Sequence, residues 1–159
     1  ANSKASPSDM LAMVNSMMTD AIAPEMFVTA AVCFFDPATG KAILSDAGHN
    51  PPVLKRASGA VEVLEIEKGF PLGVVDEGQY AELALDLSPR DTILFYTDGV
   101  TDAANDREEV FGMERLVQAA ARARPGAKNT VDAVLASVHD FVGLTRPFDD
   151  LTMIAISPR

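Results

Sequence analysis

The spacing of apolar residues at the start of the chain predicts a helix. Ser6, Pro7 and Asp9 form a pattern typical of a helix N-terminus, with a serine cap, a proline at the first helical position and an acid at the third. Apolar residues then recur at helical spacing until Pro24 stops the run: Met10, Leu11, Val14, Met17, Met18 and Ile22. The pattern predicts a helix that starts at Pro7 and ends before Pro24.

Six strand-like segments follow this helix. They are Met26–Phe35, Ala42–Ala47, Pro52–Arg56, Val61–Ile66, Tyr80–Leu87 and Thr92–Thr97. Most are separated by short stretches rich in Gly, Pro, Asp or Ser, and short connections favour antiparallel pairing. Because Met26–Phe35 and Ile93–Tyr96 are nearly continuous apolar runs, we expect both to be covered on both faces of a sheet.

Two more helices and a final strand complete the pattern. The helices are expected at about Met113–Arg124 and Val131–Val142, the second capped by Asn129 or Thr130, and the strand at Leu151–Ile156. The sequence contains no repeat, low-complexity tract or interdomain linker. We therefore expect one α+β domain with helices stacked against antiparallel sheet.

Composition narrows the class of protein. The 159 residues are 48% hydrophobic and 23% charged, as in a globular domain with one core, which excludes a disordered or fibrous chain. The 23 acids against 13 bases give a net charge of −10, which disfavours binding to nucleic acid. No apolar run approaches the roughly 18 residues of a membrane span. Cys33, the single cysteine, lies in an apolar run and has no disulfide partner, so we expect a cytoplasmic location.

Two acidic positions differ from the many acids expected to be solvated. Asp98 ends the apolar run Ile93–Thr97 and precedes Gly99, which allows close backbone approach; a simple turn closing the strand is the alternative. The pair Asp149 and Asp150 opens the last strand, and adjacent carboxylates repel each other unless water or a cation screens them. If Asp98 and Asp149 meet at one end of neighbouring strands, their oxygens suit Mg²⁺ or Mn²⁺ rather than zinc.

His49 is the other candidate for chemistry. It lies in the turn Ala47-Gly48-His49-Asn50-Pro51-Pro52, where it could act in catalysis. A histidine in such a loop more often makes hydrogen bonds that hold the turn, and this interpretation is favoured by roughly three to one. His139, in the last predicted helix, is expected at the surface.

Taken together, the motifs resemble the SpoIIE/RsbU-type branch of the PPM phosphatases, which have the protein phosphatase 2C fold. The resemblance runs from about Ser6 to the C-terminus and rests on six segments in order: Met26-Phe27-Val28-Thr29, Asp46-Ala47-Gly48-His49-Asn50-Pro51-Pro52, Gly69-Phe70-Pro71-Leu72-Gly73, Phe95-Tyr96-Thr97-Asp98-Gly99-Val100-Thr101-Asp102, Phe111-Gly112 and Phe148-Asp149-Asp150-Leu151-Thr152. Each segment alone is a weak signal, but this order and spacing are highly specific.

The resemblance implies a layered α/β/β/α sandwich of antiparallel sheets flanked by helices. It also implies hydrolysis of phosphoserine or phosphothreonine on proteins, with two Mn²⁺ or Mg²⁺ ions that hold the attacking water. Asp98 matches a ligand of one ion and Asp149 a ligand of the other. Asp150 matches a position that is Asp or Asn in the family, and Gly99 matches a position of close backbone approach. Arg107 in the segment 102–111, and His49, are candidates for substrate binding, and Lys68–Gln79 is a second candidate recognition region.

The chain departs from the family pattern at one point. The family carries an earlier Asp, followed by a Gly-x-Gly-like stretch, that bridges both metals, and nothing upstream of Ser6 supplies it. We therefore expect an N-terminally truncated domain over 1–159 that lacks the first strands and first long helix. Such a chain is expected to bind divalent metal weakly, to have little or no phosphatase activity alone, and to expose a sheet edge that favours a homodimer.

The leading functional hypothesis is the catalytic-core part of a bacterial serine/threonine phosphatase. Its substrate would be a phosphorylated regulatory protein, such as an anti-sigma-factor antagonist, and its parent would carry an upstream sensor domain. The alternative is a non-enzymatic phosphatase-fold module that binds a signalling partner. A third interpretation is another Mg²⁺-dependent hydrolase that acts on small phosphoesters.

Overall fold

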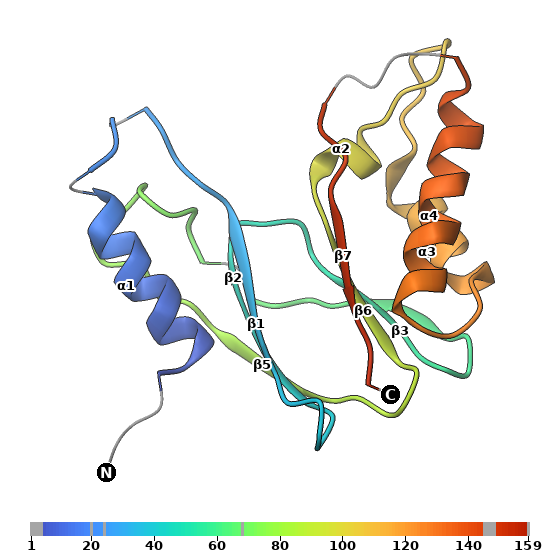
Figure 1. Ribbon diagram of the computed structural model, residues 1–159. Helices are drawn as coiled ribbons and strands as arrows, with labels where there is room; N and C mark the ends of the chain where they lie inside the picture. The colour runs from blue at the N-terminus through green and yellow to red at the C-terminus, as the bar shows by residue number, and fades with distance from the viewer. Residues whose placement is uncertain (1–4, 20, 24, 68, 145–148, 159) are drawn as a thin grey trace. The chain divides into compact units, whose positions relative to one another are not determined.

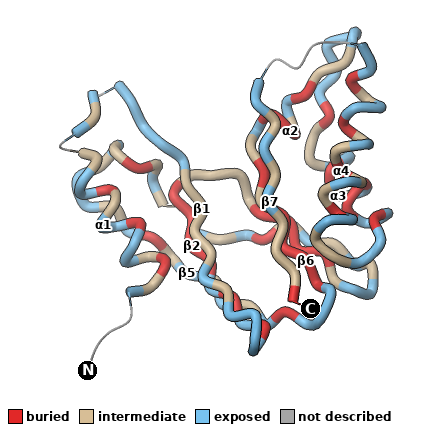
Figure 2. Tube along the Cα trace, viewed as in Figure 1, coloured by how far each residue is buried: buried red, intermediate tan, exposed pale blue. Residues whose placement is uncertain are grey.

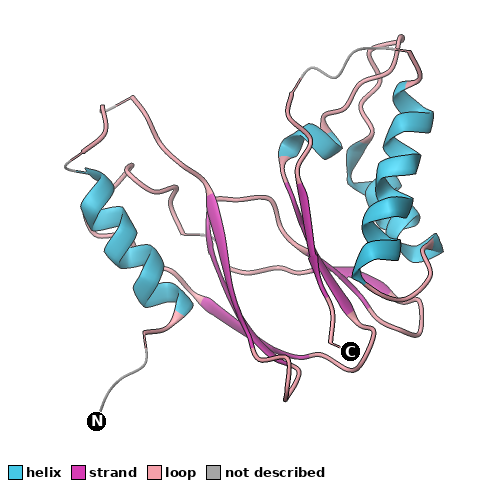
Figure 3. Cartoon of the chain, in the orientation of Figure 1, coloured by secondary structure: helices cyan, strands magenta, loops and turns pink. Residues whose placement is uncertain are grey.

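The computed structural model describes residues 5–19, 21–23, 25–67, 69–144 and 149–158 (Figure 1). The chain divides into two compact units, one of Ala1–His49 with Glu65–Asp86 and one of Asn50–Leu64 with Leu87–Arg159. Each unit has its own antiparallel sheet with helices (Figure 3), and the predicted α+β class is confirmed. Pro24, Lys68 and Phe148, which figured in the predictions, lie outside the described residues.

The first unit is a three-stranded sheet covered by one helix. Its elements are α1 (Pro7–Thr19), β1 (Ala30–Phe35), β2 (Lys41–Ala47) and β5 (Glu82–Asp86). The strand order is β1-β2-β5, and both pairings are antiparallel. A small core joins α1 to the sheet and to the loop after residue 69, and its buried members are Leu11, Ala47, Leu72 and Tyr80.

The N-terminus of α1 has the predicted cap. The Ser6 amide donates to Asp9 Oδ2 at 3.0 Å, and the Asp9 amide donates to Ser6 Oγ at 3.2 Å, which is a reciprocal capping box. Glu82 on β5 also accepts hydrogen bonds from the amide and hydroxyl of Ser8, at 3.0 and 2.8 Å. The cap therefore both starts the helix and ties it to the sheet.

The predicted helix is present, but not all of its apolar positions are buried. The helix ends at Thr19, before Ile22, and Met10 and Met17 are exposed rather than packed. The most buried side chain in its middle is polar: Asn15 is fully buried, and its side-chain amide bonds to the loop at residues 73–76. Asn15 can be buried although it is polar, because its side chain finds hydrogen-bonding partners on another segment. Apolar spacing alone therefore does not identify it as a buried position.

The second unit is a four-stranded sheet with helices. Its strands are β3 (Val53–Lys55), β4 (Val61–Val63), β6 (Thr92–Tyr96) and β7 (Met153–Ile156), in the order β4-β3-β6-β7, all antiparallel. Its helices are α2 (Asp98–Thr101), α3 (Gly112–Arg122) and α4 (Ala127–Val142). The buried β6 forms the centre of this unit (Figure 2).

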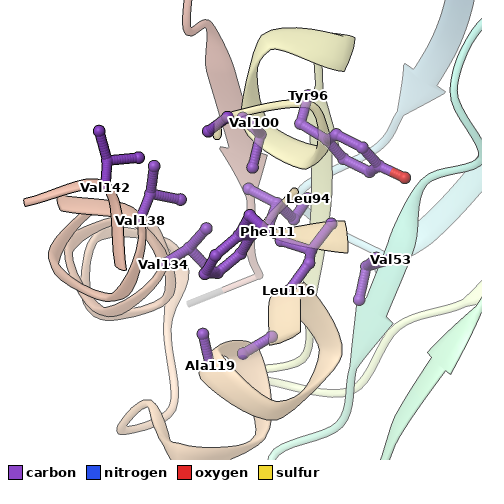
Figure 4. Close-up of a cluster of buried hydrophobic side chains, with 12 residues drawn as sticks. Val53, Leu94, Tyr96, Val100, Phe111, Leu116, Ala119, Val134, Val138 and Val142 are labelled. Atoms are coloured by element: carbon purple, nitrogen blue, oxygen red, sulfur yellow. The ribbon is translucent and has the colours of Figure 1, made fainter. Parts of the chain in front are cut away.

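The core of the second unit lies between this sheet and α3 and α4. Phe111 and Leu116 pack with β-strand residues such as Leu94, while one face of α4 contributes Val134, Val138 and Val142 (Figure 4). Arg115 lies 4.5 Å from the ring centre of Phe141, so its charge stacks on an aromatic face at the edge of this core.

The other predicted strands and helices are present with shifted boundaries. Two predictions about them, the cap of α4 and the burial of β1, are wrong. Helix α4 begins at Ala127 after Gly126, so neither Asn129 nor Thr130 caps it; the Thr130 hydroxyl instead donates to the Gly126 carbonyl at 3.0 Å from within the first turn. Strand β1 begins only at Ala30 and is half-buried, with Phe34 36% exposed, whereas β6 is buried as predicted. The apolar run thus indicated a strand in both cases, but not its degree of burial.

Candidate active site at the ends of two strands

The candidate site lies where β6 ends and β7 begins. The two strands pair in register from Ile93↔Ile156 to Tyr96↔Met153. Beyond this register the Thr97 amide donates to the Thr152 carbonyl at 3.1 Å, and the Thr152 amide donates to the Thr97 hydroxyl oxygen at 3.0 Å. The Thr97 hydroxyl itself donates to the Asp150 carbonyl at 3.0 Å. Thr97 therefore fixes the segment that carries the acidic pair against the end of β6.

The next residues of the two segments also lie against each other. A Cβ atom on Gly99 would lie 2.4 Å from the carbonyl oxygen of Asp150, closer than a real side chain tolerates. The buried Gly99 thus permits a contact that any other residue would block, and its predicted role at a metal site stays a prediction. Asp98 precedes it at the start of α2, and Asp149 lies on the facing segment. Asp98 and Asp149, which are far apart in sequence, are therefore brought to the same end of the neighbouring strands β6 and β7.

The carboxylates at this end are exposed to solvent. Asp98 Oδ1 accepts from the amide of Gly99 at 3.1 Å, and Asp149 Oδ1 accepts from the amide of Asp150 at 2.7 Å. Each carboxylate therefore keeps an oxygen atom available on the solvent side. The geometry brings Asp98, Asp149 and Asp150 to one edge, but their role as metal ligands stays a prediction.

These residues do not by themselves make a complete metal centre. Mg²⁺ takes six oxygen ligands, of which one or two are carboxylates and the rest are waters or substrate phosphates, and a two-ion site holds two such ions about 3.5–4 Å apart. Across the described parts of the chain, no three His, Cys, Asp or Glu side chains group in a way that could hold a metal ion. The donor type suits a hard cation, whereas the number of donors does not, so the chain fits part of a metal site only.

A cavity of about 320 Å³ opens beside the acidic pair, within the second unit. Its wall is largely apolar, and Asp149 lies on it together with Gly99 from α2. The lining includes the aliphatic residues Leu135, Val138, Val142 and Leu151 and the polar residues Asp102, His139 and Asp149. Nothing in the strand-end motifs predicted this cavity, because its apolar wall comes from α4, whose periodicity indicated only a core-facing helix.

His49 occupies a tightly held turn in the first unit. Its Nδ1 lies 3.0 Å from the Thr29 hydroxyl. Gly48 has φ 72°, and a Cβ on it would lie 2.8 Å from Pro71, so the turn packs closely on the segment that follows Gly69. The Asp46 side chain accepts from the Gly48 amide at 2.9 Å. These bonds agree with the structural interpretation of His49, and its candidate role in substrate binding stays a prediction.

Arg107 is displayed on a short hairpin. Ala104 pairs with Val110, and Asn105 Oδ1 accepts the amides of Arg107 and Glu109 at 2.9 and 3.0 Å. The Asn105 side chain also donates to Glu109 at 2.7 Å. Arg107 is exposed at the tip. Asn105 fixes this tip, although no motif in the sequence singled it out.

Comparison with known proteins identifies the class. The chain matches the family model of stage II sporulation protein E (SpoIIE) over residues 1–159. The chain therefore belongs to the SpoIIE family, as the resemblance of its motifs predicted. Protein IcfG of Synechocystis sp. is 28% identical over 131 residues; the match covers 82% of this chain, and the chain spans only 20% of that protein's length.

Solved structures show the same fold. The SiaA-PP2C domain of Pseudomonas aeruginosa matches with a TM-score of 0.81 at 20% identity, covering 96% of this chain and 61% of that one. The RsbU and RsbW domains of Rv1364c from Mycobacterium tuberculosis match with a TM-score of 0.75 at 23% identity, covering 97% and 42%. At these identities the likeness establishes the PP2C-type fold alone.

The names of two further structures with this fold mention a metal. The SpoIIE phosphatase domain of Bacillus subtilis, presoaked with Mn, matches with a TM-score of 0.69 at 14% identity, covering 98% of this chain and 68% of that one. RsbX in complex with magnesium matches with a TM-score of 0.62 at 15% identity, covering 89% and 59%. Manganese and magnesium are thus named for these two proteins, and the likeness itself establishes the fold. Separately, none of the described helices is both long and apolar enough to cross a bilayer.

Proposed function

We propose that residues 1–159 are the larger part of a protein serine/threonine phosphatase domain in bacterial signalling. The observation that carries the proposal is the contact between the end of β6 and the start of β7, where Gly99 meets Asp150 and Thr97 bonds to the same residue. This contact puts Asp98 and Asp149 at one strand edge, where carboxylates can hold a hard cation. Family membership supports phosphomonoester hydrolysis as the reaction.

In this proposal Asp98 and Asp149 are the metal ligands, with Asp150 as a third candidate. Bound Mn²⁺ or Mg²⁺ would supply an activated water and would neutralise charge on the phosphoryl oxygens. The incomplete donor set among the described residues supports the further proposal that the domain is truncated at its N-terminus, with the bridging carboxylate outside this chain. The isolated chain would then bind metal weakly and turn over slowly. Arg107 and His49 are the proposed contacts to substrate.

The proposed substrate is a phosphorylated regulatory protein, such as an anti-sigma-factor antagonist. Support comes from relatives in which this fold stands beside other regulatory domains, since the matched Mycobacterium tuberculosis structure contains an RsbU and an RsbW domain. An upstream sensor domain and a cytoplasmic location belong to the same proposal. A homodimer is also proposed, because the outer strands β1 and β7 each end a sheet in the described chain.

Phosphate release from a phosphoserine peptide tests the proposed activity. We would assay residues 1–159 and the longer natural protein with Mn²⁺, each as wild type, Asp98→Asn and Asp149→Asn. Asp140→Asn, an exposed acid on α4, is the matched control. Loss of turnover of about 100-fold or more in both site variants of the longer protein, with the control unchanged, is the expected result. Wild-type turnover in both site variants would refute the assignment.

A non-enzymatic binding module is the second candidate function. The observation that favours it is the lack of a three-ligand group among the described residues. Under this hypothesis the longer protein releases no phosphate with any divalent metal, yet still binds its phosphorylated partner. Turnover by the longer protein would exclude this candidate.

A further inference from the structure

The cavity beside Asp149 is the feature that the proposed chemistry leaves unused. It lies between α4, the short helix α2 and the residues that lead into β7. Leu135, Val138 and Val142 line it from α4, and Leu151 lines it from the strand side. Val138 and Val142 also belong to the buried core, and Figure 4 shows them on one face of α4. Core residues therefore form one wall of the cavity.

We propose that this cavity holds a large apolar side chain next to the phosphorylated residue of a protein substrate. The proposal rests on the proposed function, because it uses Asp149 as a member of the phosphate-handling edge. Asp149 lines the cavity, and so does Gly99, whose backbone lies against the neighbouring Asp150. An extended peptide advances about 3.3 Å per residue. Because Asp149 belongs both to the cavity and to the acidic edge, a side chain in the cavity and a phosphate at the edge are expected on neighbouring residues of the peptide.

The size and lining of the cavity favour a large apolar side chain as its occupant. A cavity of about 320 Å³ has room for one leucine, methionine or phenylalanine side chain. Apart from Asp102, His139 and Asp149 the lining is apolar, so a polar side chain placed against it would lose its hydration without finding a hydrogen-bonding partner there. An acidic side chain would also face Asp149 and Asp102 at the margin. The expected substrate class is a phosphopeptide with a large apolar neighbour.

Peptide binding tests whether the cavity holds an apolar side chain of the substrate, and it does not require turnover. Fluorescently labelled phosphoserine peptides would carry Leu or Gly directly after the phosphoserine, and each peptide would also be made without phosphate. Their affinities for the longer natural protein would be measured by fluorescence anisotropy with Mn²⁺ present, because the isolated chain is expected to bind metal weakly. Burial of a leucine side chain predicts at least about tenfold tighter binding of the Leu peptide than of the Gly peptide.

Substitutions on α4 test whether the cavity causes the preference for the Leu peptide over the Gly peptide. Leu135→Trp fills the cavity from a half-buried position, and it is expected to bring the Leu and Gly peptides within about twofold of each other. Ala136→Trp introduces the same side chain at the neighbouring exposed position and should keep the full preference. Circular dichroism and urea unfolding would establish that both variants are folded. Leu135→Ala enlarges the cavity and should shift the preference from a Leu peptide towards a Phe peptide. This variant replaces Leu135→Trp in the test if Leu135→Trp does not fold.

Each outcome separates this inference from the proposed function. Equal affinities of the Leu and Gly peptides for the wild type, no detectable binding of any peptide, or a preference that survives Leu135→Trp would each overturn the cavity assignment. A Leu preference that vanishes in Leu135→Trp while phosphorylated and unphosphorylated peptides bind equally would instead contradict the phosphatase function. In that case the cavity would be a binding site for an apolar side chain with no link to phosphate.

Discussion

The backbone of Gly99 lies so close to Asp150 that a single added carbon would meet the Asp150 carbonyl oxygen at 2.4 Å. Two residues earlier, the Thr97 hydroxyl donates to that same carbonyl at 3.0 Å. The carbonyl is backbone and cannot swing aside as a flexible side chain would. The approach of the two acidic segments therefore depends on the absence of a side chain at position 99.

Gly99→Ala should separate these segments. Overpacking against fixed backbone costs about 1–3 kcal/mol in folding free energy. Urea unfolding measures this cost, and faster amide exchange at Thr152, whose N–H bonds to Thr97, reports the local separation. Gly59→Ala is the control, because alanine there would be strained at φ 98° but nothing lies within 4 Å of the added carbon. Unchanged exchange at Thr152 in Gly99→Ala would show that the contact does not set the site.

Asn15→Leu should destabilise the first unit despite the similar size of the two side chains. Asn15 is fully buried, donates to the Val75 carbonyl at 2.8 Å and accepts from the Gly73 amide at 2.9 Å. Leucine would leave both backbone groups without these partners, at a cost of about 1–3 kcal/mol for each group that stays buried. Urea unfolding of Asn15→Leu beside the exposed neighbour Ser16→Ala measures the difference. Equal stabilities would mean that the loop at 73–76 does not depend on Asn15.

Asp91 should make the stability of the chain depend on acid pH. Burial opposes ionisation of Asp91, but hydrogen bonds from the Ala57 amide, Arg56 and the Ser88 amide, and the charge of Arg56, together lower its pKa. A lowered pKa in the folded state stabilises the fold above the unfolded pKa of about 3.9, and this stabilisation is lost as pH falls through the folded pKa.

Asp91→Asn isolates this contribution. At pH 7 the variant should be less stable than the wild type, and the gap should narrow as the pH falls below about 4, because the wild-type carboxylate then becomes protonated. Urea unfolding of both proteins between about pH 3 and pH 7 measures the gap. Glu62→Gln, at an exposed acid that also pairs with Arg56, is the control for removing a carboxylate beside that guanidinium. A gap that stays constant with pH would contradict the role given to the Asp91 carboxylate.

Arg90→Gly should stabilise the protein. Arg90 has φ 70° in the turn that leads into β6, a left-handed conformation that costs a non-glycine residue about 1–2 kcal/mol. Glycine removes this strain but adds about 0.4–1 kcal/mol of unfolded-state entropy, so a net gain of up to about 1 kcal/mol is expected. Arg90→Ala keeps the Cβ and should bring no gain. A lower melting temperature for Arg90→Gly than for Arg90→Ala would contradict this explanation.

Most elements could be predicted from the sequence because their signals are local. The Ser6–Asp9 cap, the strand 92–96 and the Asp98-Gly99 pair all depend on residues within a few positions of one another. The partners of each strand did not follow from sequence, since β5 pairs with β2 and β6 with β3 across intervening elements. The Asn15 contacts, the Asn105 hairpin and the α4 cavity were missed because each depends on how particular side chains meet backbone or neighbouring segments, which apolar spacing does not report.

Manganese binding by the two aspartate variants tests the central claim most directly. Titration calorimetry of the wild type, Asp98→Asn, Asp149→Asn and the double variant would measure whether these carboxylates serve one cation. If they do, either single substitution should remove nearly as much affinity as both together, because the ligands act as one unit. Wild-type affinity in either single variant, or losses that simply add in the double variant, would contradict a shared metal site at the ends of β6 and β7.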